Sequence, residues 1–146
     1  MILLYKKQLG LNMRIAVISA PSVRKAPPDY VQALAKGMES MGHRVDIIDA
    51  WTSDGFRLPG YEYIAVAAES ISFFSGKIPE SVNKILSAGS TLVGKKSAAF
   101  VKKGGLFTGR ALANLMRAME KEGMMVNWSE ILLNPPHAEA LGKRIG

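Results

Sequence analysis

The stretch RIAVIS, residues 14–19, together with the connection 20–28 that follows it, decides the fold. Ile15 to Ile18 form an unbroken apolar run that is rich in β-branched residues and too short for a buried helix. Such a run is typical of a strand that other elements cover on both faces. The connection carries small residues, two cations and the pair Pro27-Pro28 before a helical pattern begins. Strand, loop and helix start in this order favour a ligand site, because loops at the carboxyl ends of parallel strands face open crevices.

The rest of the chain repeats this alternation of strand and helix. Further strands are predicted over residues 44–49, 64–68, 97–101 and 125–133. Helices are predicted from Pro28 to Met41, from Pro79 toward Gly89, across the apolar stripe 112–119, and over 138–145. Residues 50–60 are too broken by turn signals for a full helix. The pattern predicts a single three-layer, doubly wound α/β domain with a five-stranded parallel sheet over residues 13–146.

Residues 1–12 are interpreted as an N-terminal extension, and Met13 is an alternative start. Their charges follow the apolar residues, which is the reverse of the order in a signal peptide. The chain has no long apolar run and no cysteine, so a soluble protein in the reducing cytoplasm is expected. The absence of cysteine also excludes disulfides, thiol redox chemistry and iron–sulfur ligation.

The charge balance indicates anionic partners. The chain has 19 basic and 12 acidic residues, a net charge of +7, and a pI near 9.8. Phosphate groups, an acidic protein or nucleic acid would all match this sign. His43 and His137 are isolated, and no P-loop, nucleophile-elbow or paired-carboxylate motif appears. The sequence therefore leaves open whether the protein is an enzyme.

Several stretches resemble the flavodoxin-like family in detail. They are GHRVDIIDA (42–50), YEYIAVAAES (61–70), SFFSGKIPESVNKIL (72–86), GKKSAAFVKKGGLFTGRALANLMRAMEKEGMMV (94–126) and HAEALGKRIG (137–146). The resemblance covers nearly all of residues 13–146. It implies the strand order 2-1-3-4-5 and an FMN site built from the loops after the first, third and fourth strands.

In this family the first of these loops is a phosphate cradle rich in Ser and Thr. Ser19 and Ser22 match it, while Arg24 and Lys25 offer positive charge instead. Prolines in the loop remove backbone donors that a phosphate would use. The alternative interpretation is an ordinary basic surface turn.

The loop after the third strand carries two adjacent aromatic rings. Phe73 and Phe74 cannot both point into one core from an extended chain, so one is expected to reach the surface or a ligand. A flavin ring is a flat apolar partner on which such a side chain would stack. The alternative is that both rings pack under neighbouring loops. The predicted contacts in this loop are Ser70, Ser72, Phe73, Phe74 and Gly76.

The loop after the fourth strand is predicted to contact the ligand through Lys103, Gly104, Gly105 and Phe107. Paired glycines allow the backbone to approach a ligand closely, although Gly-Gly is also a common turn. Thr108 is predicted to cap the following helix. Six cations follow strand ends and are expected to share one edge of the sheet, which favours a phosphorylated ligand: Arg24, Lys25, Lys77, Lys102, Lys103 and Arg110.

The leading hypothesis is an FMN-binding protein that acts in electron transfer or in small flavin-dependent redox chemistry. The alternative is a flavodoxin-like domain without flavin that binds another anionic ligand or a protein partner. A redox partner protein is the expected partner and a homo-oligomer is left open. Neither a membrane nor a specific nucleic acid is expected.

Overall fold

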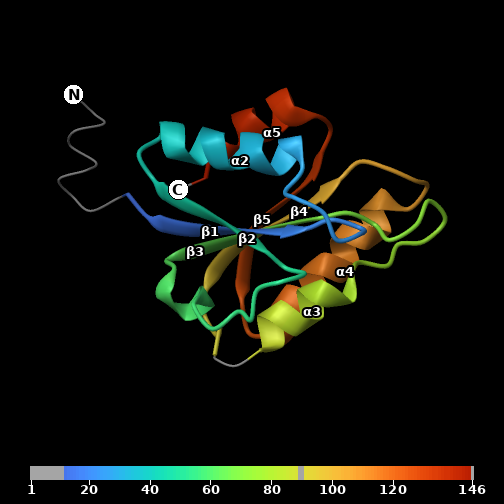
Figure 1. Ribbon diagram of the computed structural model, residues 1–146, viewed down its shortest axis with the longest axis horizontal. Coiled ribbons are helices and arrows are strands. Elements are labelled where there is room, and N and C mark those ends of the chain that lie inside the picture. The colour runs from blue at the N-terminus through green and yellow to red at the C-terminus, as the bar shows by residue number, and fades with distance from the viewer. Residues whose placement is uncertain (1–11, 89–90, 146) are drawn as a thin grey trace.

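A five-stranded parallel sheet forms the centre of the molecule. The computed structural model describes residues 12–88 and 91–145, and the sheet has the order β2-β1-β3-β4-β5 (Figure 1). The strands are β1 (Arg14–Ala20), β2 (Arg44–Asp49), β3 (Tyr63–Ala68), β4 (Lys96–Lys102) and β5 (Met125–Leu132). The predicted fold class and strand order are confirmed. The predicted extension, residues 1–12, lies outside the described residues except for Asn12, as does the predicted helix stop at Gly89.

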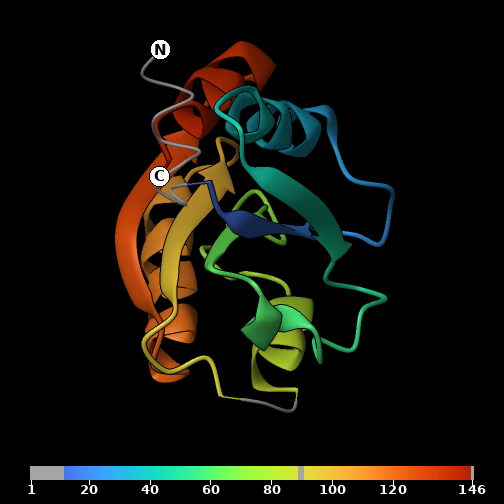
Figure 2. The same ribbon diagram turned by 90° about the vertical axis from the view of Figure 1, so that its left-hand side faces the viewer.

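The three central strands are apolar because both of their faces are covered. In β1, every residue after Arg14 is buried, and all six residues of β3 are buried. The ladder aligns Val17 with Ala65 and Ile18 with Val66. Continuous Val, Ile and Ala runs are what a parallel sheet between two helical layers requires. The strands twist relative to one another across the sheet (Figure 2).

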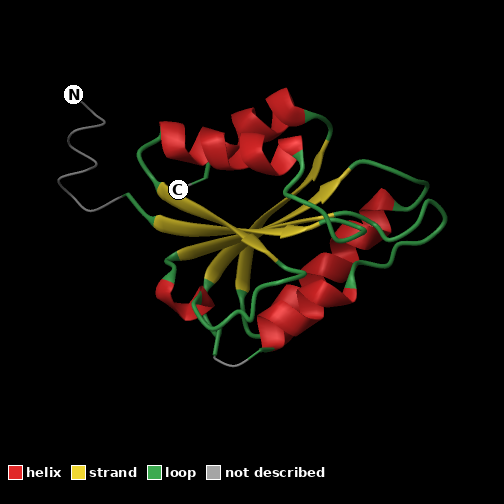
Figure 3. Cartoon of the chain, viewed as in Figure 1, coloured by secondary structure: helices red, strands yellow, loops and turns green. Residues whose placement is uncertain are grey.

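Helices cover the sheet on both faces (Figures 1 and 3). On one face lie α2 (Asp29–Ser40) and α5 (Pro135–Gly142), and on the other lie α3 (Glu80–Ser87) and α4 (Thr108–Lys121). Two separate hydrophobic cores result, one around Leu34 and Phe100 and the other around Ile85 and Leu115. Among the described residues, no helix is both long enough and apolar enough to cross a bilayer.

The helix starts differ from the prediction. α2 begins at Asp29 and α3 at Glu80, so Pro28 and Pro79 are cap residues and not the first helical residues. The last helix begins at Pro135 and not at Ala138, because the Asn134 side chain accepts a hydrogen bond from the His137 N–H at 2.8 Å. Proline suits a first helical turn, where no intrahelical partner is needed for its missing N–H. Thr108 is not the cap of α4 but its first residue, and Phe107 occupies the cap position without a side-chain cap bond. The segment 50–60 contains only the short 3-10 turn Leu58–Gly60, as predicted.

Glycines allow α2 and α5 to pack closely. A Cβ atom on Gly37 would overlap the carbonyl oxygen of Glu139 in α5, and one on Gly142 would overlap the carbonyl oxygen of Leu34 in α2. The two helix backbones are therefore in direct contact at this crossing. No side chain larger than hydrogen fits there without moving a helix.

We expect Gly37→Ala to lower the free energy of unfolding by about 1–3 kcal/mol, the usual cost of overpacking. This cost exceeds the roughly 0.5–1 kcal/mol that alanine normally gains over glycine in a helix. Gly109→Ala in α4 is the matched control, because nothing lies within 4 Å of its added Cβ and only the gain remains. Urea unfolding of both variants measures the difference. Equal effects of the two substitutions would contradict the close helix contact.

Candidate functional site

The carboxyl ends of the parallel strands bring three loops together at one edge of the sheet. These are the β1 loop (residues 21–28), the β3 loop (residues 69–79) and the β4 loop (residues 103–107), and they gather at the right-hand side of Figure 1. A pocket of about 380 Å³ lies among them. It is lined by Ser22, Glu69, Ser70, Ile71, Ser72, Phe73, Lys102, Lys103, Gly104 and Gly105.

Backbone contacts fix the β3 and β4 loops against each other. The Leu106 N–H donates to the Phe73 carbonyl oxygen at 2.9 Å. Gly105 has a φ of +74°, and a Cβ atom there would lie 2.6 Å from the same oxygen. The Thr108 hydroxyl closes the β4 loop by donating to the Gly104 carbonyl oxygen at 2.8 Å. One glycine of the predicted pair thus serves contact between loops, which only a residue without a side chain allows.

The carboxylate of Glu69 occupies the β1 loop. Its Oε1 accepts from the Ser22 N–H at 2.9 Å and from the Ser22 hydroxyl at 3.0 Å, and it lies 3.5 Å from the Lys25 ammonium. Its Oε2 accepts from the Tyr30 hydroxyl of α2 at 2.8 Å. The Glu69 N–H donates to the Ala20 carbonyl oxygen, which continues the β1–β3 ladder and sets the side chain beside the loop. One anionic group therefore ties β3, the β1 loop and α2 together.

These contacts stabilise the ionised form of Glu69. Burial alone would raise its pKa, but the hydrogen bonds from Ser22 and Tyr30 and the charge of Lys25 outweigh burial, so the pKa is lowered. The Tyr30 hydroxyl stays protonated because burial, and then the neighbouring Glu69 charge, raise its pKa. Glu69 is thus an anion at neutral pH with its donors already in place.

Aromatic side chains project from the loop edge into solvent. Phe73 is 58% exposed and Phe74 is 75% exposed, with their ring centroids 5.0 Å apart in an edge-to-face arrangement. Phe107 is partly covered by the Arg110 guanidinium, which lies 5.1 Å from its ring centroid. The alternative that both adjacent rings pack under loops is wrong. We call Phe73, Phe74 and Phe107 the aromatic rim.

The pocket gathers part of the predicted site. Seven predicted residues line it: Ser22, Ser70, Ser72, Phe73, Lys103, Gly104 and Gly105. The other six predicted residues are not among the lining residues: Ser19, Arg24, Lys25, Phe74, Gly76 and Phe107. Ser19 is buried in β1, and its hydroxyl has no hydrogen-bond partner among the described residues. Gly76 is buried against the side chain of Arg110.

The six predicted cations have different surroundings. Only Lys102 and Lys103 line the pocket, and the Lys102 ammonium lies 3.4 Å from the Lys103 carbonyl oxygen. Lys25 is paired with Glu69, and Arg110 covers Phe107. Much of the positive charge that follows the strands is therefore engaged within the protein or lies outside the pocket.

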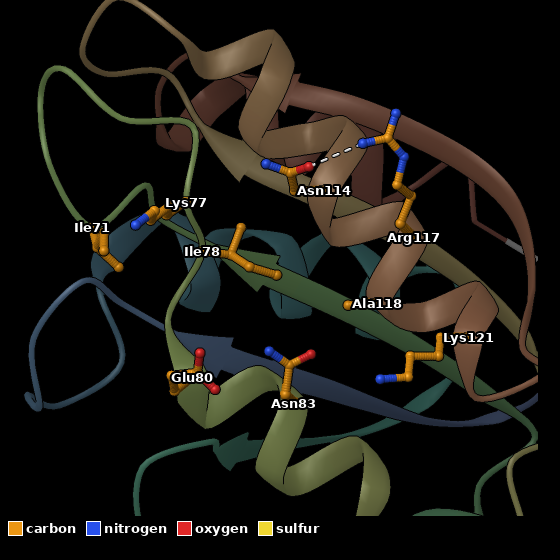
Figure 4. A pocket seen from close by; sticks show the side chains of 9 residues that line it. All are labelled: Ile71, Lys77, Ile78, Glu80, Asn83, Asn114, Arg117, Ala118 and Lys121. Atoms are coloured by element: carbon orange, nitrogen blue, oxygen red, sulfur yellow. Dashed lines mark hydrogen bonds between the residues drawn. The ribbon is translucent and has the colours of Figure 1, made fainter.

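A second cavity of about 540 Å³ lies between α3 and α4 (Figure 4). Its lining residues are Ile71, Lys77, Ile78, Glu80, Asn83, Asn114, Arg117, Ala118 and Lys121. The Asn114 amide donates to the Gly76 carbonyl oxygen at 2.8 Å, and the Arg117 guanidinium donates to the Asn114 oxygen at 3.3 Å. Ile71 lines both cavities, so the β3 loop separates them.

The sequence-based site did not include Glu69 or Tyr30. Both residues were visible in the sequence: Glu69 is an acid directly after the third strand, and Tyr30 is an aromatic residue in the first turn of the helix that follows the first strand. Their pairing joins residues 39 positions apart, and no local pattern indicates it. Lys102 and Ile71 also line the pocket although they were not predicted to contact the ligand.

The strand order and the two helical layers are those of the flavodoxin-like fold. Oxidised flavodoxin 1 from Bacillus cereus is similar at 18% identity, with a TM-score of 0.68 over 88% of this chain and 94% of that one. A flavodoxin from the domain Archaea is similar at 19% identity, with a TM-score of 0.67 over 90% and 95% of the two chains. Two-electron reduced Megasphaera elsdenii flavodoxin gives 14% identity and 0.69 over 88% and 96%. At these identities the likeness shows the shared fold.

No family model matches the sequence, and no curated protein matches it. Within residues 12–88 and 91–145, no group of three or more His, Cys, Asp and Glu side chains could hold a metal ion.

The lowered pKa of Glu69 predicts a pH-dependent contribution to stability. A carboxyl group with a depressed folded pKa stabilises the fold above its unfolded pKa of about 4.3 and loses that contribution as the pH falls through the folded value. Urea unfolding at decreasing pH should therefore show a steeper loss of stability for the wild type than for Glu69→Gln. The matched control is Glu120→Gln on the exposed side of α4, which should follow the wild type. Parallel curves for the wild type and Glu69→Gln would contradict the assignment.

Proposed function

We propose that this protein is a flavin-binding redox protein whose pocket at the loop edge takes the flavin ring. The observation that carries this proposal is an exposed aromatic rim beside a pocket of about 380 Å³ at the carboxyl ends of β1, β3 and β4. The size is within the range of small-molecule sites, roughly 300–1,000 Å³. Exposed phenylalanines offer the flat apolar contact that an aromatic ring system needs. Solved flavodoxins of the same fold add support.

More specifically, the proposed flavin is FMN, and the proposed role is electron transfer or small flavin-dependent redox chemistry. A bound flavin would supply the redox chemistry, while the protein binds and orients it. The pocket residues fit the ring of FMN, with Ile71 and Phe73 as apolar walls. The β1 loop does not fit its phosphate as it stands, because the Ser22 donors and Lys25 already contact the Glu69 carboxylate. Pro21, Pro27 and Pro28 supply no N–H to replace them.

This mismatch favours a second candidate function. A domain of this fold without flavin would use the same edge to bind a protein partner. Clustered exposed apolar side chains mark interaction sites, and here Phe73, Phe74 and Leu106 are each more than half exposed. The net charge of +7 would select an acidic partner.

Flavin titration of the purified protein separates the two candidates. The proposal expects a saturable change in flavin fluorescence on addition of the wild-type protein, because the ring leaves water for the aromatic rim. If neither riboflavin nor FMN changes in fluorescence or is retained at concentrations that saturate ordinary flavin sites, the flavin proposal is wrong and the partner-binding candidate stands.

Phe73 lines the pocket, so Phe73→Ala should weaken flavin binding by roughly 1–3 kcal/mol through lost burial and stacking. Phe56→Ala is the matched control, because Phe56 is similarly exposed, at 63%, but does not line the pocket. It should leave flavin affinity unchanged. Phe74→Ala tests whether the outer ring of the pair also contacts the ligand. Unchanged affinity in both Phe73→Ala and Phe74→Ala would show that the β3 loop is not the stacking surface.

A further inference from the structure

We propose that Glu69 is a built-in anion of the β1 loop, and that the site therefore selects flavins with an uncharged side chain over flavin phosphates. The inference rests on the proposed function and names its ligand class. The Glu69 carboxylate contacts the N–H and the hydroxyl of Ser22, the Lys25 ammonium and the Tyr30 hydroxyl.

These partners form the kind of donor set that a phosphate uses. Backbone N–H groups, hydroxyls and a cation in a loop before a helix start make an anion site, because their dipoles and charge converge on one point. Here the loop leads into α2, and Tyr30 lies in the first turn of that helix. The Glu69 side chain is only 17% exposed, so the protein's own carboxylate is enclosed by these donors.

A phosphate would have to displace this carboxylate or bind beside it. Displacement would strip Glu69 of its charge-assisted hydrogen bonds and leave an anion with few partners in a partly buried place. If the phosphate bound beside Glu69, the phosphate and the carboxylate would repel each other. An uncharged ribityl chain has neither difficulty, and its hydroxyls can both donate and accept hydrogen bonds.

The pocket lysines do not replace the occupied loop. Lys103 is exposed and Lys102 is partly exposed, and the Lys102 ammonium already lies near a backbone carbonyl oxygen. Ion pairs on exposed, flexible side chains contribute little in water. The donors that converge on Glu69, from half-buried Ser22, buried Tyr30 and exposed Lys25, should therefore decide the selectivity.

The experiment compares riboflavin with FMN by fluorescence titration of the full chain. We expect the wild type to bind riboflavin about 10- to 100-fold more tightly, which is the scale of one lost charge-assisted hydrogen bond. Glu69→Gln removes the charge and replaces one acceptor oxygen by an amide NH2 group, and it should reduce this preference. Glu69→Ala frees all of the donors and should reduce the preference further. Glu120→Gln is the control and should keep the wild-type preference. The wild-type comparison does not depend on any variant folding.

A second experiment adds inorganic phosphate without flavin. It tests whether Glu69 excludes an anion from the β1 loop, whether or not the protein binds flavin. The amide resonance of Ser22 should shift on phosphate addition in Glu69→Ala and stay fixed in the wild type. If neither flavin binds but this result holds, the flavin proposal fails while the role of Glu69 as the loop's anion stands. The inference is overturned if wild-type protein binds FMN as tightly as riboflavin, if folded Glu69→Ala keeps the preference, or if phosphate shifts Ser22 in the wild type.

Discussion

The structure depends on the need to cover both faces of a parallel sheet. The central strands carry mostly Val, Ile and Ala on both faces, and these faces are covered by α2 and α5 on one side and by α3 and α4 on the other. All neighbouring strands of the sheet are parallel, so their carboxyl ends lie at the same edge. The loops that return from β1, β3 and β4 consequently meet at one edge, and the candidate site is a result of the same constraint that builds the core.

Within that edge, a single side chain organises the loop that follows β1. The ladder between β1 and β3 continues to Glu69, whose carboxylate then meets Ser22 and Tyr30. The loop is thus ordered by an internal anion, which already accepts both hydrogen bonds that Ser22 donates. The aromatic rim lies in the β3 and β4 loops, which are fixed to each other at Gly105. The site thus combines a carboxylate that is already hydrogen-bonded with exposed aromatic rings and two pocket lysines, Lys102 and Lys103.

The sequence was sufficient for the fold because its signals are local. The apolar run at 15–18 and the prolines before the helices act within a few residues, and the sheet order followed from the family resemblance. The site was predicted only in part. That Phe73 and Phe74 would not both be buried follows from strand geometry, but the Glu69–Tyr30 pair depends on contacts across the sheet edge. The charges were also misleading: six cations predicted a basic edge, yet Lys25 and Arg110 are engaged by Glu69 and Phe107.

The account rests most directly on the ionised Glu69 carboxylate accepting the Ser22 N–H. NMR measures this contact without any ligand, through the pH titration of the Glu69 carboxyl carbon and of the Ser22 amide proton. The account predicts a Glu69 pKa below the ordinary value, and a Ser22 amide resonance that moves with the same midpoint as its acceptor is protonated. An ordinary Glu69 pKa with a Ser22 amide that does not follow it would contradict the account, because the β1 loop would then be open to another anion.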